Sequence, residues 1–154
     1  MKYLLLCLLF ISNMGAGCPD QASFLIEHIK QVNRHAPAEA IAAAIITSAT
    51  LHQVDPYLIM AQMEIESHFN PQAVGAAGER GLMQIRQKTA KDLGLSWENA
   101  HDILLNVEAG TRYMATHLRK YGDTERALSR YNGGSKQYAA AVKARYLKIV
   151  WSKL

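Results

Sequence analysis

The sequence predicts a single, mostly α domain that carries one glycine-rich loop. Three observations support this fold class. Beyond the first 17 residues, apolar side chains recur with helical spacing, and almost no stretch alternates apolar and polar residues as a half-buried strand would. Turn-forming residues divide this pattern into segments of helix length. The chain has 154 residues, which suits one domain, and no linker or internal repeat divides it further.

The first 17 residues have a different composition from the rest. A lysine near the start precedes the apolar run Leu4–Ile11, and small residues follow. This is the layout of a secretory signal peptide, and the run is too short to span a bilayer. We therefore expect residues 1–17 to be removed on export and residues 18–154 to form the domain. Cys18 would be the first mature residue and a candidate for lipidation, as in bacterial lipoproteins; secretion with a free thiol is the alternative.

Start and stop signals divide the remaining sequence into helices. Asp55 is expected to cap the third helix, with Pro56 at its first helical position. Gly94 and Gly122 are expected to follow the ends of two later helices. A loop dense in glycine and alanine, residues 70–81, follows the third helix. The helices are predicted over residues 21–33, 37–52, 55–68, 82–93, 106–121, 124–131 and 135–154.

Charge and histidine spacing exclude some classes of function. The formal net charge is +4, and it is spread along the chain. No basic stripe with interleaved aromatic residues appears, so nucleic acid is not expected as a partner. The 6 histidines show none of the spacings typical of helical metal sites. Neither a metal nor another cofactor is expected.

Two acids of the third helix are predicted to face different environments. On a helical wheel of about 100° per residue, Glu66 lies on the apolar stripe near Ile59 and Met63. Glu64 falls on the opposite side and is expected to face water. Desolvation raises the pKa of a lone carboxyl group on an apolar stripe, and such a group can protonate a glycosidic oxygen near neutral pH. The alternative is a buried structural acid paired with an arginine or a backbone amide.

The glycine-rich loop offers groups that suit a sugar ligand. Gly75, Gly78 and Gly81 would let the backbone lie close to an extended ligand. Gln84 follows them, with an amide that can both donate and accept, as recognition of an N-acetyl group requires.

Some polar and aromatic residues have two interpretations. Glu79 is the best candidate for a second carboxylate that would activate water, but we favour a solvated loop acid held by Arg80. Three aromatic residues of the last helix are either a glycan-binding stripe or part of the core, and we favour the core. They are Tyr138, Tyr146 and Trp151.

Several separated blocks carry a family resemblance. They are Glu66-Ser67-His68-Phe69-Asn70-Pro71, Ala73-Val74, Gly78, Gly81-Leu82-Met83-Gln84, Thr89-Ala90, Leu105-Asn106-Val107, Gly110, Tyr113-Met114, Ala127-Leu128 and Tyr131-Asn132-Gly133-Gly134. In this order, over about residues 50–145, they resemble the soluble lytic transglycosylases. The resemblance implies a compact lysozyme-like fold of the goose type, with the glycine-rich loop at the active site.

The resemblance also implies a reaction and a set of site residues. Glu66 would be the single acid/base that cleaves peptidoglycan glycan strands and leaves 1,6-anhydromuramic ends. The hydroxyl of Tyr131 would lie near Glu66 or near the N-acetyl group of the substrate. The substrate-binding residues would be Gly75, Met83, Gln84, Tyr131 and Asn132.

One departure from the family pattern leaves alternatives open. The family often has a serine, associated with the N-acetyl group, where this chain has Gly75. Only a backbone group or water is expected to replace that contact, which would slow the reaction. A hydrolytic muramidase on the same fold is one alternative, and a wall-binding component with weak activity is the other. The expected location is the periplasm or cell envelope, and a secretion, conjugation, pilus or phage apparatus is a candidate partner.

Overall fold

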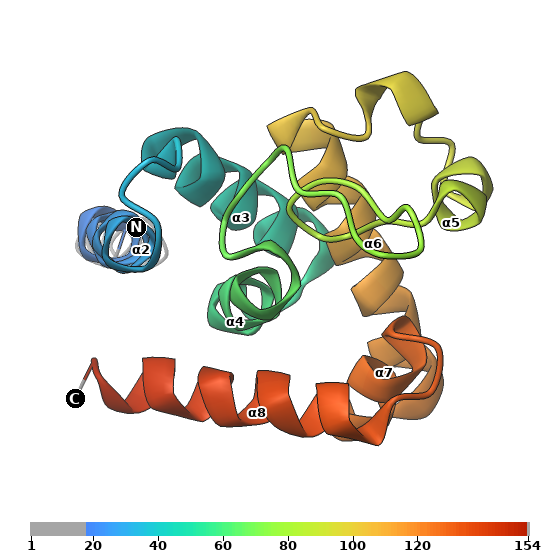
Figure 1. Ribbon diagram of the computed structural model, residues 1–154. Helices are drawn as coiled ribbons and strands as arrows, with labels where there is room; N and C mark the ends of the chain where they lie inside the picture. Colours follow the sequence, from blue (N-terminus) through green and yellow to red (C-terminus); the bar gives the residue numbers. More distant parts are fainter. Residues whose placement is uncertain (1–17, 154) are drawn as a thin grey trace, which may run out of the picture.

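The helices of the computed structural model are arranged around α4, which lies between α3 and α8 (Figure 1). α2 packs on α3, α6 packs on α3 and α7, and α7 also packs on α8. The structure describes residues 18–153, so the expected signal peptide lies outside the described residues. The helices are α2 (Cys18–Val32), α3 (Ala38–His52), α4 (Pro56–Ser67), α5 (Gln87–Asp92), the 3-10 helix η1 (Trp97–Asn99), α6 (Ile103–Tyr121), α7 (Thr124–Tyr131) and α8 (Lys136–Trp151).

Side-chain caps explain where several helices begin. The carboxylate of Asp55 accepts a hydrogen bond from the backbone N–H of Tyr57 at 2.8 Å, and Pro56 is the first residue of α4, as expected. Asp102 caps α6 in the same way. This cap makes α6 begin three residues earlier than the sequence pattern predicted. Gly122 ends α6 with a φ of 64°, as expected for a glycine in the left-handed region.

The segment that follows the glycine-rich loop is not helical at its start, so the prediction of a helix over residues 82–93 is wrong in its first half. Arg80 and Ile85 exchange backbone hydrogen bonds in both directions, each at 3.0 Å. Gly81 and Gln84 have φ values of 78° and 46°, which no α-helix contains. The apolar side chains of this segment are buried by a tight turn. Their spacing in the sequence resembles that of a helix, although the backbone is not helical.

Asn106 of α6 holds this turn in place. It is fully buried, and its Oδ1 accepts a hydrogen bond from the backbone N–H of Met83 at 2.8 Å. Its Nδ2 donates to the carbonyls of Arg80 at 3.0 Å and Ala100 at 2.7 Å. At Gly81, a Cβ would lie 2.4 Å from that Nδ2 and from the carbonyl oxygen of Ala100. The close approach therefore requires a glycine.

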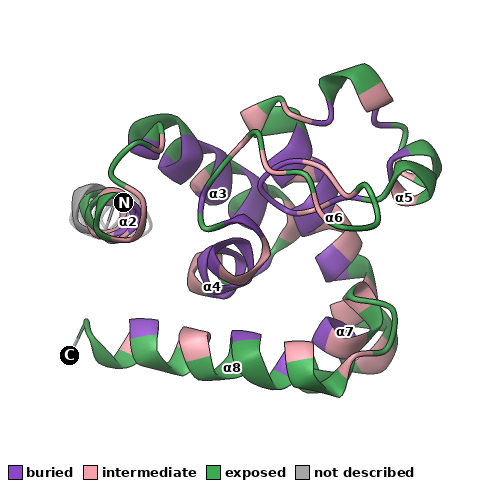
Figure 2. Ribbon diagram, in the orientation of Figure 1, coloured by how far each residue is buried: buried purple, intermediate pink, exposed green. Residues whose placement is uncertain are grey.

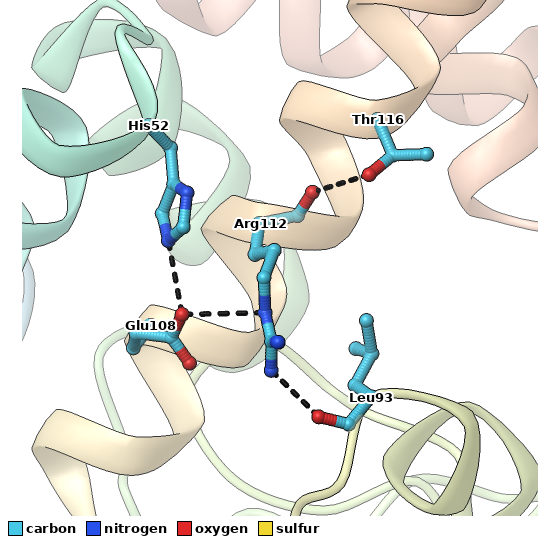
Figure 3. Close-up of polar contacts among 5 residues, drawn as sticks. All are labelled: His52, Leu93, Glu108, Arg112 and Thr116. Atoms are coloured by element: carbon cyan, nitrogen blue, oxygen red, sulfur yellow. Dashed lines mark hydrogen bonds and ion pairs between the residues drawn. The ribbon is translucent and has the colours of Figure 1, made fainter.

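A polar network joins α3, α6 and the end of α5 (Figure 3). The Nε2 of His52 lies 2.9 Å from the carboxylate of Glu108, and the Nε of Arg112 lies 3.3 Å from the same oxygen. Arg112 also donates to the carbonyl of Leu93 at 2.6 Å, and Thr116 donates to the carbonyl of Arg112. The network fixes α5 relative to α6, and α5 forms one wall of the site described below.

The core lies between α2, α3, α4, α6 and the tight turn. In α8 the buried positions lie on the side that faces α4 (Figure 2). None of the helices within residues 18–153 is long and apolar enough to cross a membrane. The largest fully buried side chains are Leu25, Ile29, Ile41, Ile45, Ile59, Met60, Met63, Phe69, Leu82, Met83, Ile85 and Met114.

Glu64 is buried, so the prediction that it faces water is wrong. Only 4% of its surface is exposed. Its two carboxylate oxygens lie 2.8 Å from the Nε2 of His28 and 2.8 Å from the Nη1 of Arg145. These partners belong to α2 and α8, which cover the side of α4 that the helical wheel assigned to solvent. A wheel describes one helix alone, and α4 has neighbours on more than one side.

Candidate active site

Glu66 lies in the last turn of α4 and is half-buried. Its Oε1 accepts a hydrogen bond from the hydroxyl of Tyr138 at 2.5 Å. Burial raises the pKa of Glu66 to about 7, and the hydrogen bond from Tyr138 opposes that rise. The direction agrees with the expectation from the apolar stripe. A carboxyl group with this pKa is present in both its protonated and its ionised form near neutral pH.

Tyr138 is the contact that the sequence did not indicate. Tyr138 and Tyr146 are half-buried and pack against the core, as predicted, whereas Trp151 does not. Tyr138 binds Glu66, the hydroxyl of Tyr146 donates to the carboxylate of Asp55 at 2.7 Å, and Trp151 is 70% exposed. The two partners in the Glu66–Tyr138 pair are 72 residues apart. No local pattern marks such a pair, because it depends on how α8 packs across α4.

A pocket of about 400 Å³ opens beside Glu66. It lies where the end of α4, the glycine-rich loop, α5, α6 and the end of α7 meet. Within residues 18–153, no group of three or more His, Cys, Asp or Glu side chains is placed to hold a metal ion. The lining residues are Glu66, Glu79, Gln84, Ile85, Arg86, Lys88, Thr89, Tyr113, Arg130, Tyr131, Asn132 and Gly133.

The structure brings together four of the six predicted site residues in this pocket: Glu66, Gln84, Tyr131 and Asn132. Gly75 and Met83 do not line it. Three basic side chains also line the pocket, and no sequence pattern marks them, because their loop and helix positions look like ordinary solvated surface. These are Arg86, Lys88 and Arg130. Arg86 is paired with Glu79, so Lys88 and Arg130 supply the positive charge that suits an acidic ligand.

Met83 lies behind the pocket and its side chain does not line it, so substrate binding through its backbone stays a prediction. Its side chain is fully buried and packs on α6 at Gly110, where a Cβ would lie 2.5 Å from the Cβ of Met83. Its carbonyl accepts a hydrogen bond from the hydroxyl of Tyr131 at 2.9 Å. Burial, and next the charge of Glu66, raise the pKa of Tyr131 well above its ordinary value. Tyr131 therefore lies near Glu66, as expected, but donates its proton elsewhere.

The amide of Gln84 has its donors occupied. Its Nε2 donates to the carbonyls of Ala73 at 3.2 Å and Gly81 at 2.9 Å, which holds the glycine-rich loop closed. An amide nitrogen carries two N–H groups, so both are used. The expectation that Gln84 both donates and accepts is therefore corrected. Its Oε1 is the atom left for a ligand.

Glu79 lies in the pocket with Glu66, so the interpretation as a solvated acid held by Arg80 is wrong. Only 17% of its side chain is exposed, and its Oε1 lies 3.0 Å from the Nε of Arg86. Its Oε2 accepts a hydrogen bond from the backbone N–H of Ala77 at 3.0 Å. The guanidinium of Arg80 lies instead over the ring of Trp97, at 4.4 Å. Arg80 and Arg86 are both near Glu79 in the sequence, and the folded loop places only Arg86 against its carboxylate.

The two acids of the pocket have pKa values shifted in opposite directions. The hydrogen bond from its own backbone N–H, followed by those from Arg86 and Ala77, lowers the pKa of Glu79, while burial raises that of Glu66. Near neutral pH, Glu79 is ionised and Glu66 still holds a proton in part of the molecules. Such a pair of carboxyl groups with separated pKa values is typical of sites for acid/base chemistry.

The chain is similar to several known proteins. It is 37% identical over 86 residues to a transglycosylase of Enterobacteria phage PRD1, a match that covers 56% of this chain and 32% of that protein. It is 38% identical over 105 residues to membrane-bound lytic murein transglycosylase C of Yersinia pestis (strain Pestoides F), a match that covers 57% of this chain and 29% of the relative. The matched regions thus span about a third of the length of these relatives.

The fold has a counterpart among solved structures. It matches the crystal structure of an inactive mutant of the lytic transglycosylase Slt from Pseudomonas aeruginosa with a TM-score of 0.63 and 17% sequence identity. The match covers 71% of this chain and 24% of that one. This likeness confirms the mostly α, lysozyme-like fold expected from the sequence.

The family is established by a match to most of the chain. The family model described as the transglycosylase SLT domain matches residues 43–152, a span that includes every residue lining the pocket. This agrees with the resemblance to the soluble lytic transglycosylases carried by the separated blocks. The chain therefore belongs to the transglycosylase SLT domain family.

Proposed function

We propose that this protein is a peptidoglycan lytic transglycosylase in which Glu66 is the single acid/base. The observation that carries the proposal is the state of Glu66: a half-buried carboxyl group with a pKa of about 7, bound by Tyr138 and open to a pocket of about 400 Å³. A group that first gives a proton and then takes one back works best when its pKa lies near the working pH.

The proposed reaction cleaves the β-1,4 bond between N-acetylmuramic acid and N-acetylglucosamine. Glu66 gives its proton to the glycosidic oxygen, and the bond between that oxygen and C1 of muramic acid breaks. The resulting cation at C1 is attacked by the 6-hydroxyl of the same sugar. Glu66 takes the hydroxyl proton as the 1,6-anhydro ring closes. The proton balance is restored without water, so no second carboxylate is required.

Tyr138 supports the charged form of Glu66 during this cycle. After the first proton transfer, Glu66 is a carboxylate in a partly desolvated site, and the hydroxyl of Tyr138 donates to it. A hydrogen bond to an ionised group contributes about 1.5–3 kcal/mol. Both protonation states of Glu66 are then accessible within one turnover.

A hydrolytic muramidase is the second candidate, and Glu79 favours it. Its ionised carboxylate lines the same pocket as Glu66, where a second acid could activate water. The wall-binding alternative, suggested by Gly75, would leave Glu66 without a catalytic role.

Digestion of purified peptidoglycan separates these three functions. Wild-type protein, Glu66→Gln and the control Glu39→Gln would be compared by mass spectrometry of the released fragments. Glu39 is an apt control because its side chain is 68% exposed in an ion pair with Lys30. We expect anhydro ends from wild type and control, and at least a hundredfold less product from Glu66→Gln.

Each other outcome contradicts one part of the proposal. Fragments heavier by one water molecule, with reducing ends, would identify a hydrolase. Digestion by Glu66→Gln equal to that by the wild type would show that Glu66 is not the acid/base. Wall binding without digestion by the wild type would support the binding component.

We further infer that the protein acts in the cell envelope, where its proposed substrate lies. Lipidation of Cys18 remains a prediction, which incorporation of labelled palmitate into wild type and its loss in Cys18→Ala would test. Service to a secretion, conjugation, pilus or phage apparatus also remains a prediction, since any of them requires local opening of the wall.

A further inference from the structure

Nearby side chains, and not the backbone angle, limit the space at Gly75. It is not among the residues with positive φ. A Cβ at this position would lie 2.5 Å from the Oε2 of Glu79 and 2.6 Å from the Oε1 of Gln84. Real Cβ atoms are not found at such distances from other atoms, so one of these side chains would have to move. The volume next to Gly75 is therefore filled by the carboxylate of Glu79 and the amide oxygen of Gln84.

The loop holds this carboxylate in a fixed position. The neighbouring residues 76–78 are exposed, yet the side chain of Glu79 is only 17% exposed. Arg86 binds one carboxylate oxygen and the N–H of Ala77 binds the other, each at 3.0 Å. The backbone N–H of Gly75 also donates to the carbonyl of Glu79 at 2.8 Å, which closes the loop. An acid at the tip of a free loop would instead turn towards water.

The fixed carboxylate can still accept hydrogen bonds. An ionised carboxylate has about four acceptor positions and no donor. The contacts from Arg86, Ala77 and the backbone N–H of Glu79 itself use three of these positions, so one is left for a ligand. Glu79 lines the pocket together with Glu66, and its charge contributes to the raised pKa of Glu66. The open acceptor position is thus in the same pocket as the reacting acid.

We propose that Glu79 is a substrate-binding residue whose carboxylate accepts a hydrogen bond from an N–H or O–H group of the glycan, and that it occupies the place of the side chain absent at Gly75. Positions 75 and 79 act as a pair: the absence of a side chain at Gly75 leaves a space, and the carboxylate of Glu79 occupies it as a hydrogen-bond acceptor. This inference rests on the proposed function for the identity of the ligand. It replaces the expectation that only backbone or water serves this position.

Binding measurements without turnover test the pair. The probe is a soluble peptidoglycan tetrasaccharide, and the parent protein is Glu66→Gln, so that the ligand stays intact during calorimetry. Adding Glu79→Ala to this parent should weaken binding about tenfold, as loss of a hydrogen bond to a charged group implies. Adding Gly75→Ser to that variant should recover part of the affinity, because the serine hydroxyl enters the space left by the carboxylate, while the end of the Gln84 side chain must still shift to admit the new Cβ.

The same Gly75→Ser substitution should have the opposite effect on affinity when Glu79 is present. Gly75→Ser alone, with Glu79 present, should weaken binding, because its Cβ and the Glu79 carboxylate compete for one volume. Glu39→Gln in the same parent should bind like the parent, since its carboxylate lies in an exposed ion pair with Lys30. If Glu79→Ala unfolds the loop and lowers Tm, Glu79→Gln keeps the shape of the side chain and takes its place.

The outcomes separate this inference from the proposed function. Parent-like affinity in the Glu79 variants, or no recovery on adding Gly75→Ser, would overturn the pair while leaving the proposed reaction intact. No binding of the tetrasaccharide by the parent would overturn both. Reducing ends in the digestion experiment would change the reaction but not the role of Glu79 in binding.

Discussion

At the scale of single residues, the properties of Glu66 follow from two opposing contacts. Burial at the end of α4 disfavours its charge, and the hydroxyl of Tyr138, 2.5 Å away, favours it. The charge of Glu79 raises the pKa of Glu66 by a smaller amount, and the charge of Arg86 lowers it. A carboxyl group balanced in this way exchanges its proton near neutral pH, which neither a solvated glutamate nor a fully buried one would do.

Substitution of Tyr138 by phenylalanine should move the pH dependence of activity. Without the hydroxyl, the pKa of Glu66 rises further, by roughly one unit or more for a hydrogen bond to a charged group. The general acid then stays protonated to higher pH, so the basic limb of the kcat/KM profile on peptidoglycan should shift upwards. Maximal activity should fall about tenfold, because the ionised intermediate loses its donor.

Tyr146→Phe is the matched control for this experiment. Its hydroxyl lies on the same helix but binds Asp55, at the other end of α4. Its profile should keep the wild-type basic limb. An unshifted limb in Tyr138→Phe would mean that the hydroxyl does not control the protonation of Glu66.

Glu66→Gln should make stability less dependent on pH. The folded pKa of about 7 lies above the ordinary value of 4.5, so the folded state holds this proton more tightly than the unfolded state. The stability gained from it is complete below about pH 4.5 and is lost as pH rises through 7. That shift corresponds to about 3 kcal/mol. Urea denaturation should show wild type losing about this much between pH 4 and pH 8 relative to Glu66→Gln; parallel curves would contradict the raised pKa.

At the scale of elements, the glycine-rich loop depends on α6 for its shape. Asn106 satisfies one backbone donor and two backbone acceptors of the tight turn and its surroundings from a fully buried position. This tight turn places Gln84 in the pocket lining, and its Met83 carbonyl accepts the hydrogen bond from Tyr131. One side chain of a neighbouring helix thus positions several groups of the site.

Asn106→Ala should therefore reduce both stability and activity. Each buried backbone group left without a partner costs about 1–3 kcal/mol, so the free energy of unfolding should fall by about 3 kcal/mol in total. Thermal denaturation and digestion of peptidoglycan would measure the two effects. Asn99→Ala, an exposed position in η1, is the control and should change stability little. Retained stability in Asn106→Ala would show that water replaces the amide.

At the scale of the whole molecule, α4 is held by a hydrogen bond and an ion pair to helices from both ends of the described chain. The carboxylate of Glu64 binds His28 of α2 and Arg145 of α8, and its surface is 4% exposed. α8 also binds Asp55 and Glu66 through Tyr146 and Tyr138. The helix that carries the catalytic candidate is thus fixed by contacts along its length.

Arg145→Ala tests how much this arrangement contributes. It leaves Glu64 buried with one of its two partners, and removal of one member of a buried ion pair costs about 3 kcal/mol. The partial exposure of Arg145, 33%, should keep the loss in the range of about 2–3 kcal/mol. Lys143→Ala, on the same helix in an exposed pair with Glu125, should cost less than about 1 kcal/mol. Equal losses in urea denaturation would show that burial of Glu64 adds nothing.

The sequence by itself determined the features that depend on neighbouring residues. The start of α4 at Asp55-Pro56 and the end of α6 at Gly122 both follow from caps that act within one helical turn. The motif around Glu66 indicated both the family and the acid, and the apolar stripe predicted the direction of its pKa. These signals are local, so one chain read in order is enough to find them.

Only the tertiary structure decided which distant groups meet. Tyr138 reaches Glu66 across 72 residues, and Glu64 is buried because two helices close over it. Glu79 turns into the pocket because the folded loop presents Arg86 to it and leaves room at Gly75. The physical reason is the same in each case. Burial, ion pairing and hydrogen bonding act over a few ångströms in space, and the sequence does not state which residues lie that close until the helices have packed.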